Sequence, residues 1–101
     1  MPGISRDKDL AATGHGCSPV APCIASASSV FVNGIRVARR GDKLKSHFIT
    51  NPDPDPICIG HTAKINRGSP TVFAEGIPVA RRGDSADQGA MIVASGDVLA
   101  G

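Results

Sequence analysis

The apolar and polar positions of this chain repeat as one pattern: a short apolar run, a turn, a second apolar run and a closing Arg-Arg-Gly-Asp. Residues 30–42 and residues 72–84 both follow it, and ten of their thirteen positions are identical. Each copy places a turn-forming pair, Asn33-Gly34 or Glu75-Gly76, between two apolar runs of the length of β-strands. The pattern therefore predicts two copies of one β-hairpin, and a repeat of this quality organises the fold.

A third and weaker copy appears when the C-terminus is read on into the N-terminus. Without any gap, this places Leu99 at the position of Phe73 and Asp9 at the position of Asp84. The three units then begin at residues 30, 72 and 98, and the chain ends meet inside the third unit. We expect a ring of three unequal hairpin units with pseudo-threefold symmetry, which tapers into a cone or plug. The alternative is an ordinary β-sandwich with one duplicated hairpin.

The connections between the units predict little further regular structure. Residues 10–23 are rich in Gly and Pro and are expected to form a loop, whereas residues 24–29 alternate and are expected to enter the first hairpin as a strand. A last strand is expected around residues 91–93. In the longest connection, residues 43–68, the prolines of residues 51–56 favour an extended path, a stiff spacer that leads to Cys58. The predicted fold class is all-β without significant helix.

The composition predicts a small domain that needs stabilisation beyond its hydrophobic core. The 101 residues predict a single domain over residues 1–101, with no effector domain attached. Three Phe and no Trp or Tyr leave the core without most of the large side chains that dominate core energetics. A domain of this size buries a modest share of its surface, so its core is marginal. The candidates for an additional staple are three His and three Cys.

Several function classes are disfavoured by charge and patterning. The net charge is +2 and no aromatic platform accompanies the two Arg-Arg pairs, which argues against nucleic-acid binding. We expect each pair to lie at a solvated strand end, with an Arg held by the Asp that follows. The longest apolar run, residues 90–94, is far shorter than the roughly 20 residues that span a bilayer. The odd number of cysteines and a charged N-terminus predict synthesis in the cytoplasm, with neither a signal peptide nor a disulfide framework.

Two histidines occupy matching places in the repeat. His47 follows Asp42 by five positions, and His15 follows Asp9 by six. We therefore expect both side chains to converge near the axis of the ring. The unit that begins at residue 72 has Gln88-Gly89 at these positions and is expected to supply no ligand.

The remaining ligands are expected from the pair Cys58 and His61, whose spacing lets a single turn present a thiolate and an imidazole to one metal ion. A set of three His and one Cys suits a closed, tetrahedral zinc site that contributes folding energy. Cys17, close to His15, is the main rival for the fourth position. Cys23 is expected to be a buried small apolar residue, and a redox-active disulfide between Cys17 and Cys23 is an alternative that no Cys-x-x-Cys motif supports.

Three segments resemble the PAAR (Pro-Ala-Ala-Arg) repeat family: Pro78-Val79-Ala80-Arg81, Arg36-Val37-Ala38-Arg39 and, across the chain ends, Gly3-Ile4-Ser5-Arg6. The resemblance implies a small conical β-protein, one copy of which sharpens the tip of the trimeric β-helical spike of a type VI secretion system or of a phage tail. Such a tip is delivered outward into the target cell, and any effector cargo would be a separate protein. The resemblance also implies a zinc ion near the vertex, held by residues that match His15, His47, Cys58 and His61.

Two other function classes compete with the structural one. A zinc-dependent hydrolase would need an open coordination position and a general base, for which Asp53 or Asp55 is available, and Cys58 with His61 would be a conceivable nucleophile pair. A small metal carrier would need the ligands but no ring of hairpins. We expect a protein without enzymatic activity, because no catalytic metal-site spacing is present and the four ligands close the site.

Overall fold

A computed structural model describes residues 1–50 and 58–101 of the chain. These residues form short strands and no helix, which confirms the all-β prediction. None of the described residues therefore forms a helix long and apolar enough to cross a membrane. The Pro-rich segment, residues 51–56, lies outside the described part of the chain, and so do Asp53 and Asp55. The strands are β1 (Leu10–Ala12), β2 (Val20–Ile24), β3 (Phe31–Val32), β4 (Ile35–Arg36), β5 (Lys43–Leu44), β6 (His47–Thr50), β7 (Cys58–His61), β8 (Phe73–Ala74), β9 (Ile77–Pro78), β10 (Ser85–Ala86) and β11 (Gly89–Met91).

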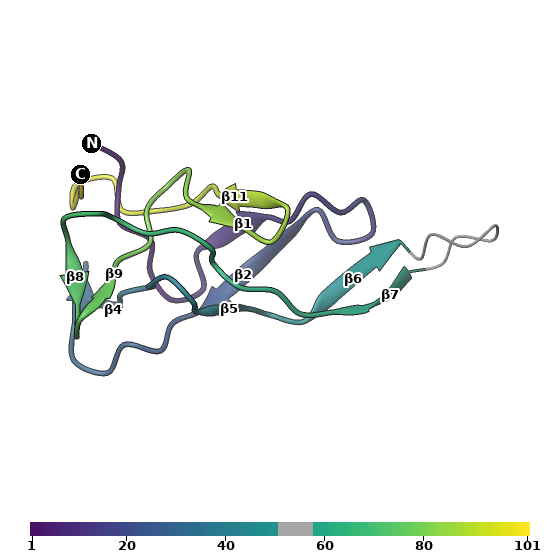
Figure 1. The fold of residues 1–101 in the computed structure, drawn as a ribbon, viewed down its shortest axis with the longest axis horizontal. Helices are drawn as coiled ribbons and strands as arrows, with labels where there is room; N and C mark the ends of the chain where they lie inside the picture. The colour runs from purple at the N-terminus through teal and green to yellow at the C-terminus, as the bar shows by residue number, and fades with distance from the viewer. Residues whose placement is uncertain (51–57) are drawn as a thin grey trace.

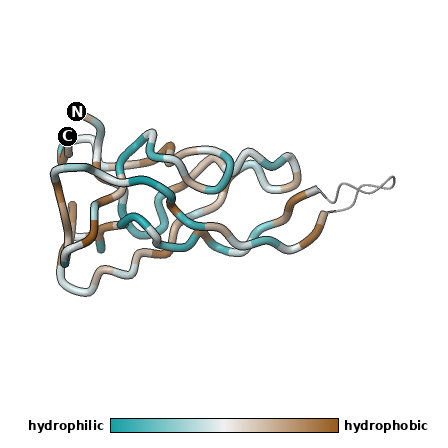
Figure 2. Tube along the Cα trace, viewed as in Figure 1, coloured by the Kyte–Doolittle hydropathy of each residue, from teal (hydrophilic) through white to brown (hydrophobic). Residues whose placement is uncertain are grey.

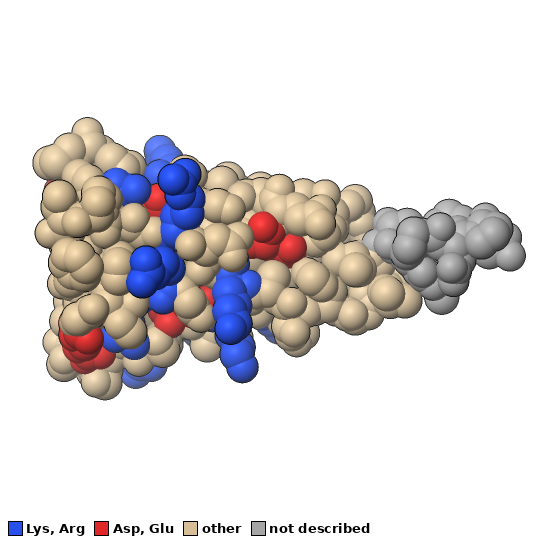
Figure 3. Space-filling model, in the orientation of Figure 1, with Lys and Arg blue, Asp and Glu red and all other residues tan. Residues whose placement is uncertain are grey.

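The molecule is elongated, with principal extents of 45 × 24 × 20 Å. Its body is a five-stranded sheet in the order β10-β11-β1-β2-β5, and the hairpins β3-β4, β6-β7 and β8-β9 are separate two-stranded sheets. Both chain ends and the hairpins β3-β4 and β8-β9 lie at one end, whereas β6-β7 extends from the other (Figure 1). The described surface tapers from the first end toward the second, and Lys and Arg side chains gather in a band between them (Figure 3). We call these the broad end and the narrow end.

The broad end contains the three predicted hairpins in one register. The Cα partners are Phe31 with Arg36, Phe73 with Pro78 and, across the chain ends, Leu99 with Gly3. Both residues of each turn, Asn33-Gly34 and Glu75-Gly76, have positive φ, as a tight two-residue hairpin turn requires. In the third hairpin the two chain ends take the place of that turn, which confirms the wrapped repeat.

A ring of backbone hydrogen bonds joins the three units. Ser5 N donates to Ala80 O at 2.9 Å, Ala80 N donates to Ala38 O at 2.9 Å, and Ala38 N donates to Ser5 O at 3.0 Å. These residues occupy the same position of their units, and all three are fully buried. A closed cycle of backbone hydrogen bonds around the pseudo-threefold axis thus joins the three units.

The core is arranged in two layers along this axis. The layer at the broad end contains Ile4, Val37 and Val79, which are equivalent in the three units, and Figure 2 shows apolar chain concentrated there. The next layer contains Ile65 and Met91. Cys23 lies with them, only 1% exposed, at the equivalent position of the third unit. The prediction that Cys23 is a buried apolar residue is confirmed, and burial, reinforced by nearby carboxylates, raises the pKa of its thiol to about 12.

Regular structure lies elsewhere than predicted at several connections. Residues 10–23 contain β1 and most of β2, whereas no strand forms over residues 25–29. There, Ala25 N donates to Asp7 Oδ1 at 2.9 Å and Ser26 N donates to Asp42 Oδ2 at 3.2 Å, so side chains replace a neighbouring strand as acceptors. The last strand, β11, ends at Met91 and so lies two residues earlier than expected.

The Arg-Asp contacts follow the repeat in two of the three units. Arg81 Nη2 lies 2.9 Å from Asp84 Oδ1, and the equivalent Arg6 contacts Asp9 in the same way. Arg39 differs, because its guanidinium contacts Glu75 at 3.2 Å. Of the two Arg-Arg pairs, Arg40 and Arg82 are exposed, as expected of solvated strand ends, whereas Arg39 is buried and Arg81 half-buried, so that expectation is wrong for the first Arg of each pair.

Candidate metal centre

The three histidines predicted as ligands come together at the start of the narrow end. His47 is the first residue of β6 and His61 the last of β7, and the two are directly opposite in the antiparallel register, so their side chains share one face. His15 reaches them from the loop after β1, where its N–H donates to Thr13 Oγ1 at 3.1 Å and Thr13 in turn donates to Ser18 O. The ring centroids lie 5.0–5.8 Å apart.

A fourth residue, Asp87, lies at the centre of this cluster. Its Oδ1 is 3.0 Å from His15 Nε2 and 3.3 Å from His61 Nε2, and its Oδ2 is 2.7 Å from His47 Nε2. Asp87 belongs to the unit that begins at residue 72, which was expected from the sequence to supply no ligand. The only signal for it was an acidic residue immediately before Gln88 in the turn of that unit.

The backbone holds Asp87 in an unusual conformation. Its φ is +54°, in the left-handed region that residues with a side chain adopt less often, although Asp tolerates it better than most. Asp87 N donates to Lys64 O and Asp87 O accepts from Asn66 Nδ2, both at 3.1 Å. Next to it, a Cβ on Gly89 would lie 1.9 Å from Ala12 O, so only glycine allows this turn to pack against β1. The turn thus directs the carboxylate toward the histidines.

The cluster is shielded from solvent. The Asp87 side chain is 4% exposed, His15 and His47 are similarly covered, and His61 is the most accessible of the four. Burial alone raises the pKa of Asp87, but the hydrogen bonds with His15, His47 and His61 outweigh it and the pKa lies below its ordinary value. The carboxylate is therefore ionised among three imidazoles.

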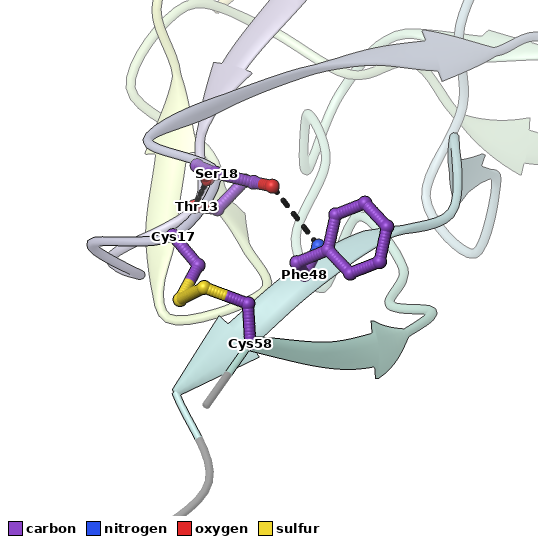
Figure 4. Close-up of a disulfide and its surroundings, with 5 residues drawn as sticks. All are labelled: Thr13, Cys17, Ser18, Phe48 and Cys58. Carbon is purple, nitrogen blue, oxygen red and sulfur yellow. Dashed lines mark hydrogen bonds between the residues drawn. A yellow bond between two sulfur atoms is a disulfide. The ribbon is translucent and has the colours of Figure 1, made fainter. Parts of the chain in front are cut away.

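Cys58 lies outside this cluster, because the structure joins it to Cys17 in a disulfide (Figure 4). The prediction that one turn presents Cys58 and His61 to the same metal ion is wrong, since both residues lie in β7. Side chains three positions apart in a strand point to opposite faces. The expected absence of a disulfide framework is wrong at this pair, while Cys23 remains a free thiol.

The four donor groups are of the kinds that transition metals bind. The three imidazole nitrogens and one carboxylate oxygen all lie within 4.8 Å of one another. Zinc takes His nitrogen and Asp oxygen ligands in four-coordinate sites, and the same set also suits other divalent transition metals. This donor set therefore fits a single metal ion held between the three units.

Comparison with known proteins identifies a family for this chain. The family model of the PAAR motif matches residues 13–94, which is most of the chain and includes all four residues of the cluster. A search among curated proteins finds no significant match.

Proposed function

The chain belongs to the PAAR motif family, the spike-tip proteins of type VI secretion systems, and from this premise we propose that its broad end caps a trimeric β-helical spike. In this role one copy of the chain covers the blunt end of the trimer. The narrow end then points away from the spike and forms the piercing tip. The function is mechanical and requires no catalysis.

One observation carries this proposal: the three hairpins expose an apolar side chain at the same position. Phe31 and Phe73 are each 55% exposed and Leu99 is 45% exposed. They are equivalent in the repeat, and each lies in the strand pair that builds the broad end. Contiguous exposed apolar groups commonly mark an interaction site. A trimer with threefold symmetry presents the same surface three times, and these three positions offer it three matching contacts.

The backbone ring supports the same role. Because Ser5, Ala38 and Ala80 hydrogen-bond to one another in a cycle, the three hairpins are held at fixed mutual positions. A rigid cap loses little conformational freedom when it binds, which favours affinity. The apolar layer of Ile4, Val37 and Val79 lies directly under this surface.

We also propose that the metal at the candidate centre is a structural zinc ion. The site lies where the three units converge, and a metal bound there would join them at a point where the molecule narrows. Metal binding of this kind contributes folding free energy. The Asp87 and His47 side chains are each 4% exposed and the His15 side chain is 10% exposed, so little of the site is open to a substrate. This supports a structural ion over a hydrolytic one.

Native mass spectrometry of the chain mixed with a trimeric β-helical spike from the same genome tests the capping role. We expect one copy of this chain per spike trimer. About half of the surface of Phe73 is available to be buried, and at about 25 cal/mol per Å² it is worth about 2 kcal/mol, so Phe73→Ser should weaken binding roughly 30-fold.

Phe48→Ser provides the matched control, because Phe48 is 54% exposed but lies in β6 at the narrow end. This variant should bind the spike as the wild type does. A chain that ignores every trimer, or equal losses from Phe73→Ser and Phe48→Ser, would contradict docking through the broad end.

A further inference from the structure

We propose that the fourth ligand of the metal centre is Asp87, so that the site is His3Asp, and that Cys58 instead fastens the narrow end through its disulfide with Cys17. This inference rests on the proposal that the centre binds metal and is independent of the capping role. It assigns a ligand to the unit that begins at residue 72, which has no histidine at the matching position. It also departs from the set of three His and one Cys that the family resemblance implies.

The distances around Asp87 are close to those of a coordination site, and the four donor atoms of the cluster lie within 4.8 Å of one another. Zinc bonds to His nitrogen and carboxylate oxygen are about 2.0–2.1 Å long, which places the ligand atoms of a tetrahedron roughly 3.3 Å apart. The three distances from the Asp87 oxygens to the imidazole Nε2 atoms are 2.7, 3.0 and 3.3 Å. The carboxylate therefore stands beside the three imidazoles as a fourth ligand would.

The hydrogen bonding of His47 gives an independent reason to place a cation here. Its Nδ1 lies 2.9 Å from Lys45 O, and a carbonyl oxygen only accepts hydrogen bonds, so Nδ1 carries the proton. The other ring nitrogen, Nε2, therefore faces the cluster and lies 2.7 Å from Asp87 Oδ2. A backbone carbonyl on the remote nitrogen is the usual partner of a metal-bound histidine.

The conformation of Asp87 points the same way. Its carboxylate is almost fully buried, and a buried charge is costly unless it is paired or binds a metal. Its backbone adopts φ of +54°, and such conformations concentrate at functional sites. The close approach of Gly89 to Ala12 O fixes the same turn. The left-handed turn thus presents one buried carboxylate to three imidazoles.

The disulfide accounts for Cys58 without a metal. It joins β7 to the loop after β1, across a sequence separation of 41 residues. Ser18 Oγ, from the same loop, accepts from Phe48 N at 3.0 Å on β6 (Figure 4). The loop that presents His15 is therefore attached to both strands that present His47 and His61. In this arrangement the Cys17–Cys58 disulfide holds the ligand-bearing segments together, and the metal has only nitrogen and oxygen ligand atoms.

Metal content of the full chain, loaded with zinc and then dialysed, tests the assignment. The wild type and the double variant Cys17→Ser/Cys58→Ser should each retain one zinc ion per chain, although the double variant should melt at a lower temperature. Asp87→Ala should lose more than the roughly 10–100-fold in zinc affinity that removal of an outer-shell partner costs. Asp97→Ala is the control, because Asp97 hydrogen-bonds Asn33 and Ser95 away from the cluster and should leave zinc binding unchanged.

Two further measurements use the wild type alone, so they do not depend on whether a variant folds. The cobalt(II) form should show ligand-field bands without the strong near-ultraviolet absorption that thiolate ligands produce. The zinc-loaded protein, unfolded without reductant, should show one reactive thiol, that of Cys23. Zinc loss in the double variant with retention in Asp87→Ala, or a thiolate band with cobalt, would overturn the assignment in favour of Cys58. A wild type that binds neither metal would overturn it together with the zinc proposal, while the capping role would still be decided by the spike experiment.

Discussion

Replacing Gly3 by alanine should open the ring at the junction between the chain ends. Gly3 pairs with Leu99 and so closes the third hairpin. A Cβ built on Gly3 would lie 2.0 Å from Ser95 O, 3.1 Å from Ser95 C and 3.3 Å from Ala94 Cβ. The two shortest contacts are with backbone atoms, so no side-chain rotation can relieve them. The chain around Gly3 or Ser95 must move instead.

The hydrogen bonds around this contact set the cost of that movement. Ser95 N donates to Ile4 O at 2.8 Å, and Arg82 N donates to Gly3 O at 2.9 Å, so a shift disturbs two units at once. Overpacking in a core costs about 1–3 kcal/mol, and we expect about 3 kcal/mol here because the obstacle is backbone. In a domain of this size each kcal/mol lowers Tm by about 4–8 °C, which gives a decrease of roughly 12–24 °C.

Thermal and urea unfolding followed by circular dichroism measure this effect, and Gly96→Ala is the matched control. Gly96 is the residue after Ser95, a Cβ there would meet no atom within 4 Å, and its φ is not in the left-handed region. Gly96→Ala should therefore be neutral or stabilising by about 0.5 kcal/mol. If Gly3→Ala unfolds at the same temperature and urea concentration as Gly96→Ala, the chain ends do not pack as a closed hairpin and the reasoning is refuted.

Three further predictions concern groups whose environment the fold changes. The raised pKa of Cys23, about 12, keeps its thiol protonated, so iodoacetamide at about pH 8 should label Cys23 only after the protein unfolds. The buried neutral thiol stabilises the fold fully below the ordinary thiol pKa, and this stabilisation is lost as pH rises through about 12. Hydrogen bonds from Ser29 and Ser28 lower the pKa of Glu75 to about 2, so ionised Glu75 stabilises the fold above its ordinary pKa and this stabilisation is lost as pH falls toward 2. In Glu75→Gln the free energy of unfolding should therefore fall less steeply between about pH 4 and pH 2 than in the wild type, and an unchanged slope would contradict this. Asp84→Asn should cost about 2 kcal/mol in urea unfolding, because the half-buried Arg side chain of its unit loses a charged partner at 2.9 Å, and a change below about 0.5 kcal/mol would show that solvent already compensates it.

The three hairpins could be read from the sequence because their determinants are local. An apolar run, two residues able to adopt positive φ and a second apolar run specify a hairpin wherever they occur. Asn33-Gly34 and Glu75-Gly76 adopt that conformation as predicted. The third hairpin was predictable only through the repeat, since its two halves lie at opposite ends of the chain. The pairing of Leu99 with Gly3 confirms it.

The convergence of the histidines was also predictable, for the same reason. Because His15 and His47 follow their units at nearly the same interval, symmetry alone brings them toward one axis. The burial of Cys23 beside Ile65 and Met91 likewise follows from the ring. Because the units repeat around one axis, residues at equivalent positions of the repeat could be predicted to lie close together in space.

Only the tertiary structure decided which residue completes the cluster. The direction of a side chain depends on the backbone conformation and on the strand with which that backbone pairs. β7 pairs with β6, so Cys58 and His61 face opposite ways and Cys58 meets Cys17 from a distant loop. Asp87 reaches the histidines because a turn with positive φ packs against β1 through Gly89. These are contacts between segments far apart in the chain, and the sequence pattern within each segment contains no information about the other.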